Sequence, residues 1–219
     1  MTETATRVQA SFLAGAEKRL LIWLAKRLPP AVNSDHLTGL SLVSMAAAGW
    51  AYWRASVNPQ WLWAVNLCIV LNWFGDSLDG TVARVRNKQR PRYGYYIDHI
   101  VDAVCSVFLL GGLGLSGFMH PAVAAALLIV YLLLSIESYL ATYARNEFRI
   151  SHFGFGPTEL RILLIVGNFF LLDRPVVPFL GGDYRLYDIG GVIGAIAMGF
   201  VLLAAVWRNA SALYREETK

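Results

Sequence analysis

The amino-acid sequence predicts an all-α integral membrane protein with six transmembrane helices and an N-terminal amphipathic helix at the membrane interface. Of its 219 residues, 56% are hydrophobic and only 16% are charged, and the mean hydropathy is +0.47. This composition is too apolar for an ordinary soluble domain. Repeated apolar stretches are long enough to cross the hydrocarbon core. Cationic residues cluster at the ends of these stretches, which argues against nucleic acid as a partner.

Residues 1–33 are expected to form an interfacial helix and a linker. The apolar run Leu20–Ala25 is short and is followed by two cations and two prolines, so it is not a signal peptide. One side of the helical wheel collects Phe12, Ala16, Leu20, Trp23 and Leu24. A helix lying on the membrane surface is the expected structure. A cytosolic helix packed on the domain is the alternative.

Residues 34–219 are expected to form one six-span bundle without a second domain, with Asn33 or Ser34 as the N-cap of its first helix. The spans are expected at residues 37–56, 60–84, 95–117, 120–145, 157–180 and 187–208. All but three of the 19 Lys and Arg residues lie on one side of these spans; the other side holds Arg54, Arg174 and Arg185. Because cytoplasmic loops are enriched in cations, both termini are predicted to face the cytoplasm.

Four aspartates flank the connection between the second and third spans: Asp76, Asp79, Asp98 and Asp102. On helices, the first two are i,i+3 neighbours and the last two are i,i+4 neighbours, so each pair shares a face. Carboxylates at membrane depth are costly unless they are paired or ligated. Four together favour a hard cation, Mg²⁺ or Mn²⁺, and have room for two metals. Snorkelling or capping would explain one aspartate more easily than four.

Two small residues and a cation continue the face of the first aspartate pair. Gly80, Ala83 and Arg84 lie with Asp76 and Asp79 on an arc of about 140° of the helical wheel. The small residues leave the helix backbone open to a flat nucleotide, and Arg84 has the forked donors that suit a diphosphate. A nucleotide site is therefore predicted on this face.

The spacing of these residues resembles a known signature. The pattern D-x2-D-G-x2-A-R-x9-G-x3-D-x3-D over residues 76–102 resembles that of the CDP-alcohol phosphotransferases, membrane enzymes that make phospholipids, and every position is filled. The likeness extends weakly to residues 33–38. It implies Asp76, Asp79, Asp98 and Asp102 as metal ligands, Asp102 also as the base for the attacking hydroxyl, and Asp79, Gly80, Ala83 and Arg84 around the CDP group.

The resemblance implies transfer of a phosphatidyl group from CDP-diacylglycerol to a polar alcohol, with release of CMP. A CDP-choline or CDP-ethanolamine donor with diacylglycerol as acceptor is the alternative within the family. It also implies a bacterial cytoplasmic membrane, an active site facing the cytoplasm, and a homodimer. A membrane prenyltransferase would place its acidic motifs in distant halves of the chain, whereas Asp79 and Asp98 are neighbours in sequence. An ion-coupled transporter would show an internal repeat.

The acceptor site is predicted from charges at the ends of the fourth and fifth spans: Arg145, Arg149, Glu159 and Arg161. Inward-facing arginines would favour a phosphorylated acceptor, and an inward-facing glutamate a cationic amino-alcohol. Snorkelling into the interface is the alternative.

Two further polar residues within the spans have open roles. Asn72 either supports a metal ligand or makes a hydrogen bond between helices. Glu137 is either functional or paired structurally.

Overall fold

The computed structural model describes residues 6–8, 14–145, 147–149, 157–179 and 181–218. The helices are α1 (Ala14–Arg27), α2 (Ser34–Ala55), α3 (Trp61–Val85), α4 (Pro91–Leu115), α5 (Pro121–Arg145), α6 (Pro157–Asp173) and α7 (Leu186–Glu217). Strand β1 (Thr6–Val8) pairs in parallel with β2 (Glu147–Arg149). Strand β3 (Val176–Phe179) pairs antiparallel with β4 (Gly182–Arg185). The predicted all-α class is confirmed, with two small strand pairs added.

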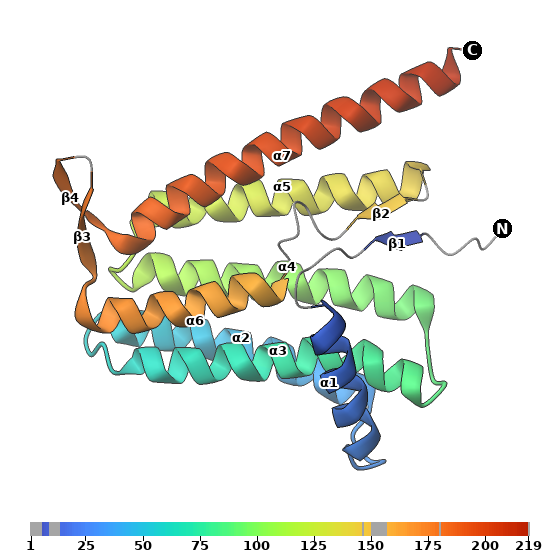
Figure 1. The fold of residues 1–219 in the computed structure, drawn as a ribbon, viewed down its shortest axis with the longest axis horizontal. Coiled ribbons are helices and arrows are strands. Elements are labelled where there is room, and N and C mark those ends of the chain that lie inside the picture. Colours follow the sequence, from blue (N-terminus) through green and yellow to red (C-terminus); the bar gives the residue numbers. More distant parts are fainter. Residues whose placement is uncertain (1–5, 9–13, 146, 150–156, 180, 219) are drawn as a thin grey trace.

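Helices α2 to α7 run roughly along the long axis of the molecule, whereas α1 lies across it (Figure 1). The connection from α3 to α4 and the end of α7 lie at one end of the molecule, and α1 lies in the same half. The β3–β4 hairpin lies at the other end. The aspartate segment is therefore at the end that carries most of the cationic residues.

Within the described residues, three helices, α4, α5 and α7, are long and apolar enough to cross a membrane. Helices α2 and α3 have 22 and 25 residues, but polar side chains interrupt their apolar sequence. Helix α6 has 17 residues, or about 26 Å, which is short of the roughly 30 Å hydrocarbon core. It ends at Asp173, before the expected limit of 180, because Pro175 disfavours helical backbone in the residue before it.

Local signals explain where the helices that carry the site begin. Asn33 caps α2: its side chain accepts from the His36 N–H at 3.0 Å, and His36 Nδ1 accepts from the Asn33 N–H at 3.4 Å. This reciprocal pair is a capping box and confirms the predicted N-cap. Pro91 begins α4, where its missing N–H costs nothing.

Glycines let α2 approach both α3 and α4 at backbone distance. A Cβ on Gly49 of α2 would lie 2.2 Å from the Phe108 carbonyl oxygen, and one on Gly112 of α4 would lie 2.1 Å from the Gly49 oxygen. A Cβ on Gly75 of α3 would lie 2.5 Å from the Leu37 oxygen. Any side chain at these positions would separate the helices. Helix α2 therefore holds α3 and α4 together, and these helices carry the four aspartates.

Helix α1 buries Leu21 and Ala25 against residues of α2 and α3. Leu20 and Trp23, which belong to the predicted apolar side, stay about half exposed. Phe12 lies outside the described residues. The helix thus packs on the bundle through one apolar edge and presents a second one outward, as a helix at a membrane surface would.

Candidate active site

Three of the four aspartates meet between α3 and α4. Asp76, Asp98 and Asp102 each offer a carboxylate oxygen, and these oxygens all lie within 4.8 Å of one another. All three residues are half-buried. The predicted faces of α3 and α4 therefore meet, and they concentrate negative charge in a partly buried site.

The fourth aspartate, Asp79, is held by the start of α2. Its Oδ2 accepts from the Thr38 hydroxyl at 2.6 Å, and its Oδ1 accepts from the Gly80 N–H. The Ser34 hydroxyl donates to the Asp79 carbonyl at 2.9 Å. This gives the 33–38 segment a physical role, because it orients Asp79. The metal-ligand role of Asp79 stays a prediction.

Arg161 of α6 supplies the cation of the cluster. Its Nη2 donates to Asp76 Oδ2 at 2.7 Å, and its Nε donates to Asn72 Oδ1 at 2.9 Å. Asn72 Nδ2 in turn donates to the Ser41 hydroxyl of α2 at 2.7 Å. Asn72 therefore makes the expected hydrogen bond between helices, joining α3 to α2, and it also contacts the arginine that pairs with Asp76, while its support of a metal ligand stays a prediction. One guanidinium beside three carboxylates leaves an excess of negative charge.

The predicted nucleotide face runs from the aspartates toward the end of α3. A Cβ on Gly80 would lie 3.3 Å from Arg84 Nη1, and Arg84 Nη2 donates to Thr81 Oγ1 at 3.0 Å. The glycine thus makes room for the guanidinium to lie along the helix. Arg84 is exposed and Ala83 is half-buried, so this face stays accessible next to the carboxylates.

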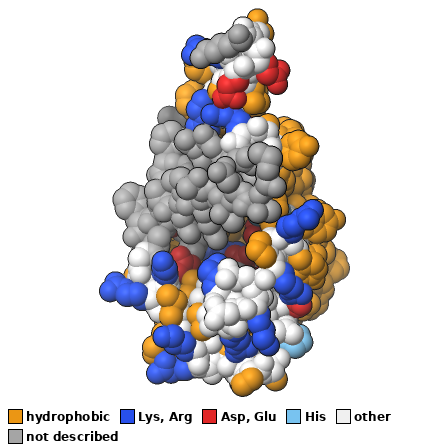
Figure 2. All heavy atoms as spheres, turned by 90° about the vertical axis from the view of Figure 1, so that its right-hand side faces the viewer, with side chains coloured by type: hydrophobic (Ala, Val, Ile, Leu, Met, Phe, Trp, Pro, Cys, Tyr) orange, Lys and Arg blue, Asp and Glu red, His pale blue; other side chains and the backbone are white. Residues whose placement is uncertain are grey.

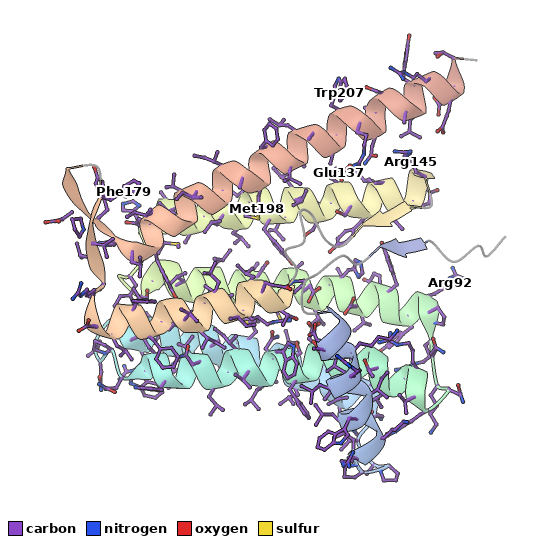
Figure 3. The ribbon with its side chains drawn as sticks, viewed as in Figure 1. Arg92, Glu137, Arg145, Phe179, Met198 and Trp207 are labelled. Carbon is purple, nitrogen blue, oxygen red and sulfur yellow. The ribbon has the colours of Figure 1, made fainter. Side chains whose placement is uncertain are left out.

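The predicted acceptor residues divide between different places. Arg161 joins the aspartate cluster. Arg145 Nη1 donates to Asn209 Oδ1 of α7 at 2.7 Å, and Asn209 Nδ2 donates to Glu137; Figure 3 shows Glu137 and Arg145 along the part of α5 next to α7. Glu159 is half-buried in the first turn of α6, and the structure describes only the backbone of Arg149 in β2. Glu137 is therefore paired structurally.

One contact that was not predicted from the sequence ties α1 to the site. Glu17 Oε1 accepts from Trp73 Nε1 and from Thr158 Oγ1, each at 2.8 Å. Trp73 precedes Asp76 by three residues, and Thr158 precedes Arg161 by three. Because residues three apart share a helix face, the glutamate bridges the two faces that carry the site. The signal in the sequence is that Trp73 and Thr158 each lie three residues before a site residue, and it becomes visible only once Arg161 is known to belong to the site.

Stacked rings form another wall of the cluster. His99 lies between Tyr95 of α4 and Tyr139 of α5, with ring centroids 4.1 and 4.7 Å apart. His99 Nδ1 is 3.5 Å from Asp98 Oδ2. The position of His99 in sequence suggests a flanking residue, and in the structure it makes one of the contacts between α5 and the aspartate helix α4.

Cations of the α3–α4 connection hold the neighbouring segments. Arg86 donates to the backbone carbonyls of Leu28, Pro29 and Val32, and Arg90 pairs with Asp35. Figure 2, which looks onto this end, shows Lys and Arg side chains spread over the surface with acidic side chains between them. Cationic side chains therefore surround this end of the molecule, which suits a phosphorylated ligand.

The donor set fits a divalent metal. Three carboxylates converge, and the group contains no thiolate or imidazole ligand, which is the ligand chemistry of Mg²⁺ and Mn²⁺. Among known protein families, the model of one described as CDP-alcohol phosphatidyltransferase matches residues 32–207. The comparison with curated proteins finds no match. The matched region begins just before α2 and includes every aspartate of the site.

Proposed function

The chain belongs to the CDP-alcohol phosphatidyltransferase family, and from that premise we propose that it moves a phosphatidyl group from CDP-diacylglycerol to a polar alcohol. Membership makes it a transferase that uses a CDP-linked donor and an alcohol acceptor in a membrane. The convergence of Asp76, Asp98 and Asp102 within 4.8 Å, beside the open face of Gly80, carries the proposal. The small side chains of Gly80 and Ala83 beside these acidic oxygens support a nucleotide site on this face of α3.

Asp76, Asp98 and Asp102 would hold the metal, with Asp79 next to them on α3 for a second ion. Bound there, Mg²⁺ or Mn²⁺ would neutralise the charge of the diphosphate during phosphoryl transfer. Arg84 donates to the diphosphate, and the small side chains of Gly80 and Ala83 admit the cytidine. These residues bind and orient the donor.

Asp102 accepts the proton of the attacking alcohol. A bond forms between the alcohol oxygen and the phosphorus that carries the lipid. The bond from that phosphorus to the bridging oxygen breaks, and CMP leaves with the electron pair. Arg161 lies beside Asp76, where it would orient the acceptor. We therefore expect a phosphorylated alcohol as acceptor, while Arg145, Arg149 and Glu159 remain predicted members of its wall.

In the proposed setting, all six helices from α2 to α7 cross a bacterial cytoplasmic membrane and α1 lies on its inner surface. The cation distribution supports this orientation. It would expose the aspartate end to the cytoplasm, where CMP is released. We also propose a homodimer, and this part of the proposal rests only on the resemblance to the family.

A second candidate is transfer of an amino-alcohol phosphate from CDP-choline or CDP-ethanolamine to diacylglycerol. The stack of Tyr95, His99 and Tyr139 beside Asp98 favours it, because aromatic faces attract quaternary and primary ammonium groups. In this reaction the ammonium would lie against the rings, and the lipid hydroxyl would attack.

The experiment is an assay of purified protein with Mg²⁺ and each CDP-linked donor, against a panel of alcohols and diacylglycerol. We expect CMP release and a new lipid in mass spectrometry with CDP-diacylglycerol and one phosphorylated alcohol. Product from CDP-choline with diacylglycerol would replace the first proposal by the second. Release of inorganic diphosphate from a prenyl donor would overturn both.

A further inference from the structure

A second polar cluster lies inside the bundle around Asn168 of α6, which is fully buried. Its Oδ1 accepts from the Tyr52 hydroxyl of α2 at 2.8 Å and lies 2.7 Å from the Tyr187 hydroxyl of α7. Its Nδ2 donates to Asn66 Oδ1 of α3 at 2.7 Å. This one side chain therefore ties α6 to three other helices.

The backbone of α6 is shaped for this cluster. A Cβ on Gly167 would lie 2.7 Å from the ring and hydroxyl of Tyr187, so any larger residue would displace the tyrosine. The same hydroxyl lies 3.0 Å from the Leu164 carbonyl. Glycine next to the asparagine thus lets the Tyr187 ring rest directly on α6.

Asn168 and Arg161 lie on the same face of α6. They are seven residues apart, which puts them about 20° apart on the wheel and about 10 Å apart along the axis. A rotation of α6 about its axis by one residue, or about 100°, would break the hydrogen bonds of Arg161 to Asp76 and Asn72. The same turn would take Asn168 off its partners and leave buried polar atoms unpaired, which is unfavourable.

Apolar packing alone does not select one rotation of α6. Residues 162–165 are Ile, Leu, Leu and Ile, so the helix is apolar all round between Arg161 and Asn168. A buried polar residue that finds partners in one register only is a known means of selecting that register. Asn168 has this property here, and the cluster ends at Asn66, whose Nδ2 has no partner among the residues that the structure describes.

We propose that Asn168 is a positioning residue: with Tyr52, Tyr187 and Asn66 it sets the rotation of α6 that places Arg161 against Asp76. It touches neither substrate nor metal and acts through Arg161. The inference rests on the proposed transferase activity for its kinetic test, and a metal-binding test is independent of that activity.

The kinetic test is a double-mutant cycle between Asn168→Leu and Arg161→Ala. We expect Asn168→Leu to raise the acceptor KM at least about fivefold, toward the larger increase expected for Arg161→Ala, and to have no further effect in the Arg161→Ala background. A purely structural role would lower the active fraction by the same factor in both backgrounds and leave KM unchanged. That result would overturn the proposal. If Asn168→Leu does not fold, the double variant Tyr52→Phe/Tyr187→Phe keeps both rings and carries the same test.

The matched control is Leu171→Val, which shortens a buried side chain one turn further along α6. It should lower the melting temperature and leave the acceptor KM at the wild-type value. An increase of KM equal to that of Asn168→Leu would show that any defect in α6 has this effect, against the proposal.

The independent test measures Mn²⁺ binding by electron paramagnetic resonance. Removing the Arg161 cation from Asp76 should tighten Mn²⁺ binding, and Asn168→Leu should tighten it by the same factor. If no donor gives CMP but the two variants agree, the proposed function fails and the positioning role stands. If Asn168→Leu binds Mn²⁺ as the wild type does, the positioning role fails.

Discussion

The aspartate site and the Glu137 cluster both place charged side chains within the helices, yet their charges balance differently. At the first, three carboxylates converge, and the guanidinium of Arg161 pairs with one of them, Asp76. At the second, Glu137 and Arg145 share Asn209 between α5 and α7. There the protein itself supplies cations near the carboxylate, since Arg208 also lies 3.5 Å from Asn209, whereas an excess of carboxylates within a membrane calls for a further cation. The comparison separates the proposed ligand site from a contact that joins two helices.

The largest effect is expected at the aspartate site. Asp76→Asn replaces a charged ligand by a neutral amide, so we expect loss of both activity and metal binding. Asp102→Asn should lower kcat by about 10²-fold or more, the range that a general base supplies, and keep most affinity for the CDP-linked donor. Steady-state kinetics and donor binding check this. Equal loss of donor binding in both variants would remove the distinct role of Asp102.

Arg161→Ala should come next, since hydrogen bonds to charged groups are worth about 1.5–3 kcal/mol. We expect an increase of about tenfold or more in the acceptor KM, with a smaller change in the donor KM. Arg145→Ala is the matched variant on α5. If its acceptor KM rises as much, Arg145 belongs to the acceptor wall as well as to the contact with α7.

Gly80→Leu tests the open face without changing any carboxylate. A Cβ there already comes within 3.3 Å of Arg84, so a leucine would displace the guanidinium and fill the nucleotide space. We expect an increase of about tenfold in the donor KM, or roughly 1.4 kcal/mol. Ala83→Leu should act alike. Donor kinetics that stay unchanged in both variants, with folded protein in detergent, would place the nucleotide elsewhere.

The smallest effect is expected at Glu137. Glu137→Gln keeps an oxygen that accepts from Asn209 and loses only the charge, so stability should fall by about 1 kcal/mol or less, a few degrees in Tm. Donor and acceptor KM should not change. A loss of turnover comparable to that of Asp102→Asn would contradict the comparison and make Glu137 part of the chemistry.

Local sequence determined the parts of the site that lie on one helix. The spacings of Asp76 and Asp79, and of Asp98 and Asp102, place each pair on one face because helical geometry depends only on position along the chain. The N-cap at Asn33 is also predicted from local sequence, because its hydrogen bonds join residues that are only three positions apart. The distribution of cations along the chain likewise predicts which end of the bundle faces the cytoplasm.

Tertiary structure alone decided which of these groups meet. The orientation of Asp79 depends on its hydrogen bond from Thr38 of α2, and the placement of Arg161 depends on the rotation of α6 around Asn168. The Glu17 bridge and the pairing of Glu137 with Asn209 likewise join residues from distant parts of the chain. Because the apolar faces of these helices admit several rotations, periodicity in the sequence does not select among them. Close approach at glycines and the pairing of buried polar groups make that selection, and both exist only once the helices are packed.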